Sequence, residues 1–88
     1  MEGELVTELQ RVGFSYDGIL LNAAAYTHTS VAIGDAVSAI NTPVIEIHIS
    51  NIAAREEYRL RSFVAPKCVG TITGLGLKGY ELGLQFFL

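Results

Sequence analysis

The sequence predicts a single α/β domain over residues 1–88, built around a parallel sheet. Three strand-like segments alternate with four helix-like segments. The strands are expected at 19–22, 42–50 and 67–73, and the helices at 2–12, 30–40, 53–61 and 77–87. Strands that alternate with helices are joined by right-handed crossovers and therefore run parallel. Three strands are few for such a sheet, so the chain resembles the second half of a larger domain.

The first half of the chain carries two helical repeats around one apolar strand. Leu5, Leu9 and Val12 follow helical spacing in the first helix. Residues 19–22 are apolar up to Asn22, as expected of a strand that is buried on both faces. The hydroxyls of residues 27–30 are candidate caps for the next helix. Gly34 inside that helix costs about 1 kcal/mol relative to alanine, which hints at a close approach by another segment.

The strand at 42–50 combines an apolar face with a polar row. Successive side chains point to opposite faces of a strand. The isoleucines at 45, 47 and 49 therefore share one face, and Glu46, His48 and Ser50 share the other. An acid, an imidazole and a hydroxyl on a buried strand are costly unless they are hydrogen-bonded or used in function. Such a row, leading to a carboxyl end, predicts a site for a polar or anionic ligand.

The last third of the chain predicts a charged helix, a strand and an apolar helix. Gly70 would allow a bulge in the 67–73 strand, and Gly74 with Gly76 predicts a tight connection. The closing helix is expected to bury one stripe of large side chains. The members of that stripe are Leu77, Tyr80, Leu84 and Phe87.

Composition excludes several classes of protein. Half of the residues are apolar, 17% are charged and the net charge is −3, with no basic run. These values argue against disorder and against a nucleic-acid partner, and the apolar excess suggests surface that other chains cover. A single cysteine, Cys68, fits a reducing compartment. With no membrane-length apolar run and an acidic N-terminal segment unlike a signal peptide, we expect a cytoplasmic protein.

Asn22, His28, His48 and Ser50 follow the ends of two neighbouring strands, where open α/β sheets bind ligands. Two histidines and an asparagine at one edge favour a functional site, although a single histidine is more often structural. Glu46 could set the tautomer of His48, as a general acid requires. A buried ion pair with no catalytic role is the alternative.

Other chemical motifs are weaker. The histidine spacing matches no compact zinc motif, so we expect no metal. Cys68 is expected to be an inert core thiol. The glycines at 74, 76 and 79 match GxGxxG, but turn geometry and helix packing explain them better. Of the arginines at 55, 59 and 61, Arg59 is the one expected to reach a ligand, and a solvated face is the alternative.

Taken together, these motifs resemble the type II 3-dehydroquinate dehydratases over nearly the whole chain. The segments that carry the resemblance are AAAYTHTSVAIGDA (23–36), PVIEIHISN (43–51), AREEYR (54–59) and GLGLKGY (74–80). The resemblance implies a flavodoxin-like fold, a five-stranded parallel sheet of which three strands are present here, with helices on both faces. It also implies homo-oligomers, trimers that stack into dodecamers. The implied reaction of the shikimate pathway converts 3-dehydroquinate to 3-dehydroshikimate, with no metal or organic cofactor.

The resemblance also implies roles for particular residues. His48 is similar to the general acid that protonates the leaving hydroxyl of an enolate intermediate, and Glu46 to the carboxylate that supports it. Asn22 matches the residue that holds substrate and a water near the enolate. The other matched positions are substrate contacts at His28 and Arg59, carboxylate-binding amides at Ile49 and Ser50, and Asp35, an acid that reaches a neighbouring subunit's site.

The sequence departs from the family pattern in three ways. The family's first strand, first helix and second strand are missing, with the catalytic tyrosine and the arginine-bearing lid. None of the chain's four tyrosines stands at that tyrosine's position. Ala24 replaces a usual glycine and Ala53 a usual histidine. We therefore expect a fragment with little activity alone. A non-catalytic anion-binding or assembly module, or a fragment that does not fold, are the alternatives.

Overall fold

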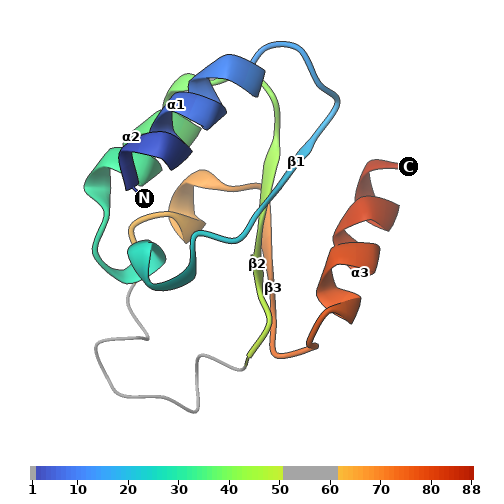
Figure 1. The fold of residues 1–88 in the computed structure, drawn as a ribbon. Coiled ribbons are helices and arrows are strands. Elements are labelled where there is room, and N and C mark those ends of the chain that lie inside the picture. Colours follow the sequence, from blue (N-terminus) through green and yellow to red (C-terminus); the bar gives the residue numbers. More distant parts are fainter. Residues whose placement is uncertain (1, 51–61) are drawn as a thin grey trace.

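The computed structural model describes residues 2–50 and 62–88, and three parallel strands lie at its centre (Figure 1). These are β1 (Ile19–Leu21), β2 (Val44–His48) and β3 (Gly70–Thr73), in the order β1-β2-β3. Ile19 pairs with Val44, and Ile47 pairs with Ile72. The predicted α/β class with a parallel sheet is confirmed. The helix predicted at 53–61 lies outside the described residues.

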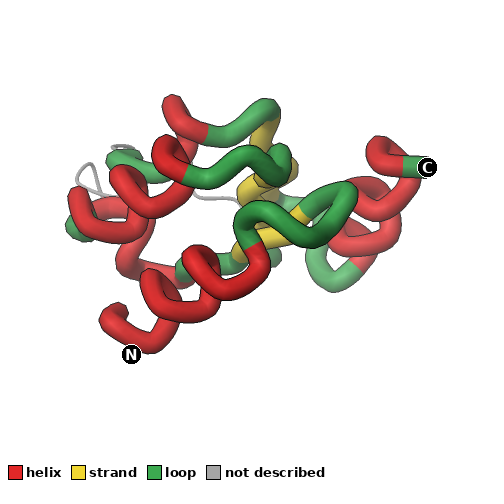
Figure 2. The backbone as a smooth tube through the Cα atoms, turned by 90° about the horizontal axis from the view of Figure 1, so that it is seen from above, coloured by secondary structure: helices red, strands yellow, loops and turns green. Residues whose placement is uncertain are grey.

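Helices cover both faces of the sheet (Figures 1 and 2). One face carries α1 (Glu2–Val12) and α2 (Val31–Ala39), and the other carries α3 (Lys78–Phe87). The main core lies on the α1 and α2 side, where Leu9, Ile33 and Val44 are buried together. The Ser30 hydroxyl caps α2 by accepting a hydrogen bond from the Ile33 amide at 3.0 Å, which confirms the expected cap.

Helix α3 packs differently from the prediction. Leu77 and Leu84 are 72% and 54% exposed, so the predicted stripe is wrong at these two positions. The buried positions of α3 are Gly79 and Gly83. A Cβ at Gly83 would lie 2.7 Å from a Leu20 methyl, so the absence of a side chain lets α3 approach the sheet closely. Close approach through glycines therefore replaces packing by leucines.

The edge strands are shorter than predicted. β1 ends one residue before Asn22, and its first two residues are only half-buried because β1 is an edge of the described sheet. β3 begins at Gly70 rather than Lys67, since a short 3₁₀ turn, η4 (Ala65–Lys67), contains Pro66. The pairing of β2 with β3 is continuous from Gly70, so the predicted bulge is wrong.

The close approach of another segment to Gly34, predicted from the sequence, is confirmed. A Cβ on this residue of α2 would lie 2.3 Å from the carbonyl oxygen of Phe63. The Phe63 amide in turn donates to the Thr27 carbonyl at 2.7 Å. Gly34 thus allows residues 62–64 to lie directly against α2, beside the edge of the sheet where the polar row of β2 ends.

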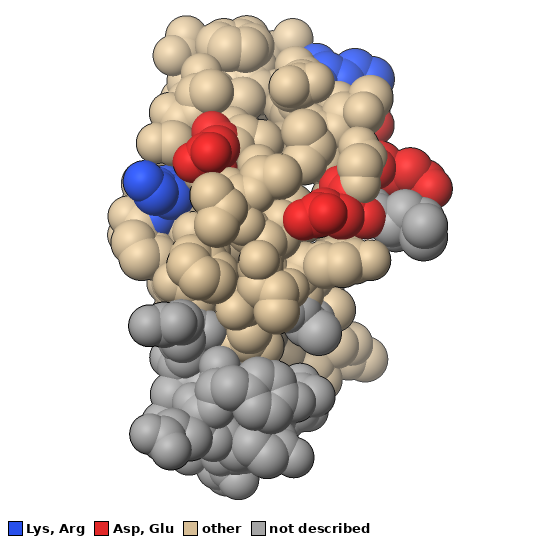
Figure 3. Space-filling model, turned by 90° about the vertical axis from the view of Figure 1, so that its left-hand side faces the viewer, with Lys and Arg blue, Asp and Glu red and all other residues tan. Residues whose placement is uncertain are grey.

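Charged side chains are few and scattered on the face that carries α1 and α2 (Figure 3). Two exposed pairs, Arg11 with Glu8 and Lys78 with Glu81, join neighbours on their own helices. Within residues 2–50 and 62–88, no helix is both long and apolar enough to cross a bilayer.

Candidate active site

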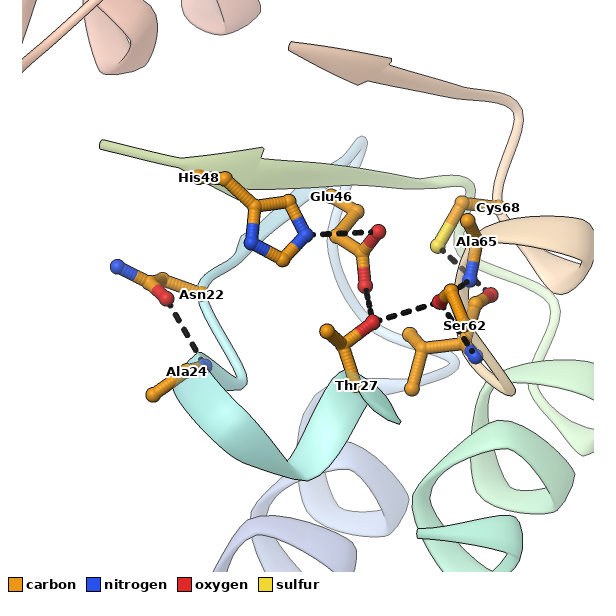
Figure 4. Close-up of polar contacts among 9 residues, drawn as sticks. Asn22, Ala24, Thr27, Glu46, His48, Ser62, Ala65 and Cys68 are labelled. Carbon is orange, nitrogen blue, oxygen red and sulfur yellow. Dashed lines mark hydrogen bonds and ion pairs between the residues drawn. The ribbon is translucent and has the colours of Figure 1, made fainter. Parts of the chain in front are cut away.

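The polar row of β2 lies in the interior of the protein, as an acid and an imidazole side by side. Glu46 is 1% exposed and His48 is 6% exposed. His48 Nε2 lies 3.0 Å from Glu46 Oε1 (Figure 4). The two atoms are in close contact but are not aligned as a hydrogen bond. Catalytic contacts are often misaligned before substrate binds.

The second carboxylate oxygen of Glu46 is satisfied from η1 (Ala24–His28), the 3₁₀ helix between β1 and α2. The Thr27 hydroxyl donates to Glu46 Oε2 in a short hydrogen bond. Thr27 Oγ1 also lies 2.6 Å from the Ser62 hydroxyl. A buried carboxylate is costly without donors, so the Thr27 hydroxyl offsets part of the cost of burying Glu46.

Asn22 is held at the same edge of the sheet by two partners. Its side-chain oxygen accepts a hydrogen bond from the Ala24 amide at 3.0 Å, and its side-chain nitrogen donates to the Tyr80 hydroxyl at 3.1 Å. Figure 4 shows Asn22 on the side of the His48 ring opposite Glu46. The amide is therefore oriented by β1, η1 and α3 together.

The two histidines meet as predicted. The ring centroids of His28 and His48 lie 6.4 Å apart with an angle of 26° between the ring planes. His28 comes from η1 and is buried, as is His48 from β2. The structure thus brings Asn22, His28, Glu46 and His48 together, although their sequence positions span 27 residues.

The other predicted residues lie at different places. Ile49 and Ser50 follow β2 and are exposed, and the Ile49 carbonyl accepts from the Gly76 amide at 2.9 Å. Asp35 lies on the exposed side of α2 and is not joined to the cluster by a hydrogen bond or ion pair among the described residues. Arg59, and Ala53 with it, lie outside the described residues.

Ala24 carries backbone strain next to Asn22. Its φ of 53° lies in the left-handed region, the one such value among the described residues other than glycine. For a residue with a Cβ this conformation costs about 1–2 kcal/mol, which explains why glycine suits the position. This strain therefore lies directly beside the cluster, at the position where the family resemblance implies glycine.

Cys68 lies behind Glu46 and is poorly reactive. Its thiol donates to the Val64 carbonyl at 3.5 Å. Burial, and secondly the charge of Glu46, raises the pKa of Cys68 to about 12. A thiol with such a pKa is not a nucleophile at neutral pH, in agreement with the expected inert thiol. The described residues hold no group of three or more side chains suited to a metal ion.

A family model described as dehydroquinase class II matches residues 1–88 of the chain. The chain belongs to this family. It is 55% identical over 84 residues to a 3-dehydroquinate dehydratase of Campylobacter lari, covering 96% of this chain and 52% of that protein. It is 52% identical over 87 residues to one of Bacillus licheniformis, covering 99% of this chain and 60% of that protein.

Solved structures of the family superimpose closely on this member. A type II dehydroquinase from Butyrivibrio crossotus matches with a TM-score of 0.95 at 43% identity, over 99% of this chain and 61% of that one. One from Propionibacterium acnes matches with a TM-score of 0.90 at 43% identity, over 99% and 64%. The flavodoxin-like fold expected from the sequence is confirmed. The chain spans between about half and two thirds of the length of these relatives.

Three residues of the cluster were missed as site residues at the level of sequence. The sequence pattern predicts Thr27 only as a cap and Tyr80 only as part of an apolar stripe, and it predicts no role for Ser62. A useful signal was present for Thr27, because a buried Glu46 requires a donor and Thr27 is adjacent to His28 in sequence. Tyr80 and Ser62 lie 58 and 35 residues from their partners, so no local pattern predicts them.

Proposed function

We propose that this chain provides the proton-donating half of an active site that dehydrates 3-dehydroquinate to 3-dehydroshikimate. The observation that supports this most is the 3.0 Å contact between the buried His48 and Glu46, at the carboxyl end of β2 in a class II dehydroquinase. A carboxylate beside an imidazole stabilises the imidazolium, the form that donates a proton to a leaving hydroxyl.

The remaining predicted residues take binding roles in this proposal. Asn22 holds substrate and a water near the enolate oxygen, and His28 contacts a substrate hydroxyl. Arg59 supplies a further contact, and the amides of Ile49 and Ser50 receive the substrate carboxylate. Backbone donors at a strand end suit an anion. Asp35, which is exposed on α2, serves a neighbouring subunit.

The proton-abstracting half of such a site is not matched by any residue of this chain. No tyrosine here stands at the position that matches the family's catalytic base, so the 88-residue chain is expected to bind substrate with little or no turnover. In its full context we propose a cytoplasmic homo-oligomer, a dodecamer built of trimers. Exposed apolar side chains such as Leu77, Leu84 and Phe86 support burial against other chains.

The proposal is tested by titrating the 88-residue chain with 3-dehydroquinate while recording the histidine and asparagine side-chain resonances by NMR. Saturable shifts at Asn22 and His48, lost in His48→Ala, are expected without product. Joined to the first strand, lid and first helix of a relative, the chain is expected to turn substrate over, and His48→Ala should abolish that turnover. Binding that never leads to turnover in the joined protein would favour an anion-binding module. No saturable binding would overturn the proposal.

A further inference from the structure

Two hydroxyls, the buried one of Thr27 and the half-buried one of Ser62, lie in a row on the side of Glu46 away from His48 (Figure 4). Thr27 is 0% exposed, and its hydroxyl contacts both Glu46 Oε2 and the Ser62 hydroxyl. Ser62 Oγ accepts hydrogen bonds from the Val64 amide at 3.1 Å and the Ala65 amide at 2.9 Å. Three segments of the chain, η1, β2 and residues 62–65, are therefore linked through the Thr27 hydroxyl to one carboxylate oxygen.

The donors and acceptors of this row have one consistent direction. A hydroxyl has one hydrogen and two lone pairs. Both lone pairs of Ser62 are taken by backbone amides, so its hydrogen points to Thr27 Oγ1. The Thr27 hydrogen is then left for Glu46 Oε2. Each bond polarises the next, and the row ends on the group that carries negative charge.

The direction of these bonds determines which oxygen of Glu46 faces the His48 imidazole. With Oε2 saturated, Oε1 is the oxygen that faces His48, at 3.0 Å from Nε2. A carboxylate oxygen only accepts, so an unprotonated Nε2 would set a lone pair against a lone pair at this distance, and the contact favours a proton on Nε2 although the bond is not aligned. The other ring nitrogen, Nδ1, lies on the side of Asn22, where a ligand would be held (Figure 4).

The geometry points to Thr27, anchored by Ser62, as a positioning residue that sets the tautomer of His48 through Glu46. Its hydroxyl holds the carboxylate in one rotamer, the carboxylate keeps the proton on Nε2, and Nδ1 is left to exchange a proton with a ligand. The catalytic meaning of this relay rests on the proposed function, but the relay itself is a property of the chain without ligand.

The test is the ratio of the two neutral tautomers of His48, read from the ¹⁵N shifts of its ring nitrogens. It is measured on the 88-residue chain without ligand, about two pH units above the ordinary imidazole pKa. Thr27→Val keeps the shape and removes the hydroxyl, Thr27→Ser keeps the hydroxyl, and Thr29→Val removes an exposed hydroxyl nearby as a matched control. Backbone amide spectra establish that each variant is folded.

Thr27→Val is expected to lower the ratio of Nε2–H to Nδ1–H about three- to tenfold, the effect of losing one hydrogen bond. Thr27→Ser and Thr29→Val are expected to leave it unchanged. An unchanged ratio in folded Thr27→Val, or an equal change in Thr29→Val, overturns the inference. If Thr27→Val does not fold, the tautomer ratios of Thr27→Ser and Thr27→Ala are compared instead. A lower ratio in Thr27→Ala is expected, and equal ratios overturn the inference. Failure to bind 3-dehydroquinate would overturn the proposed function and leave this ratio unaffected.

Discussion

The two faces of β2 are buried to a similar extent but carry side chains of opposite polarity. Toward α3 the strand presents Ile45 and Ile47, both buried, against a helix that approaches through glycines. Toward α2 and η1 it presents Val44, Glu46 and His48, which are equally buried. Residues of one strand, alternating in sequence, thus form an apolar contact on one side and a polar cluster on the other.

The difference teaches how stability and chemistry are divided within one short strand. The apolar face gains free energy from area removed from water and requires only shape. The polar face gains free energy only if each buried group keeps its partner, since an unsatisfied buried donor or acceptor costs about 1–3 kcal/mol. Loss of side-chain volume should therefore affect the first face most, and loss of a single hydroxyl the second.

The largest effect is expected on the apolar face, from Ile47→Ala. Ile47 is fully buried under Gly79 and Gly83 of α3, so truncation leaves a cavity. We expect a loss of about 2–5 kcal/mol in the free energy of unfolding, measured by urea denaturation. Leu77→Ala, at an exposed position of the same apolar type, should change it by less than about 0.5 kcal/mol. Equal losses in the two variants would contradict the described packing of α3.

Gly34→Ala tests the support of the polar face. Its Cβ would collide with the Phe63 carbonyl, so the segment that carries Ser62 must move. We expect a loss of about 1–3 kcal/mol in the free energy of unfolding, together with a changed His48 tautomer ratio. Gly3→Ala, where a Cβ meets nothing within 4 Å, is the matched control in α1 and should stabilise the helix by about 1 kcal/mol. A neutral Gly34→Ala would show that α2 and residues 62–64 are not in contact.

Tyr80→Phe tests the one described hydrogen bond that joins α3 to the cluster. The Asn22 side chain loses its acceptor while the ring is kept. Since both groups are half-buried, we expect a loss of about 0.5–1.5 kcal/mol in the free energy of unfolding. The Asn22 side-chain amide resonances should shift and broaden in NMR spectra. Tyr16→Phe, at an exposed tyrosine, should alter neither quantity.

The smallest effect is expected at Cys68, whose thiol pKa is raised in part by the charge of Glu46 on the polar face. Its pKa in the folded protein, about 12, lies above the ordinary thiol value of about 8.5. The unfolded thiol therefore ionises first as the pH rises, and the contribution of this group to stability is lost between these two values. The urea midpoint should fall more steeply above about pH 8.5 in the original chain than in Cys68→Ala.

Glu46→Gln should reduce that extra slope only in part, because burial is the larger cause of the raised pKa and the charge of Glu46 the smaller. An unchanged slope in Cys68→Ala would show that the thiol does not differ between the folded and unfolded chain.

Much of the fold was predictable because it depends on local periodicity. The repeats at 2–12 and around Ile33 and Val37 became α1 and α2 with nearly the predicted ends. The alternation along β2 assigned Glu46 and His48 to one face. The prediction failed for α3, where an apolar repeat suggested a buried stripe of leucines. Periodicity ranks side chains by polarity, whereas contact with the sheet was decided by the small volume of Gly79 and Gly83.

By itself, the sequence determined the α/β class, the polar row of β2, its place at a strand end and the resemblance to one enzyme family. These follow from spacing within segments of about ten residues. Only the tertiary structure decided which hydroxyl serves Glu46, which ring orients Asn22 and why Gly34 lacks a side chain. Those contacts join residues between 19 and 58 positions apart, and only folding of the chain brings such residues together.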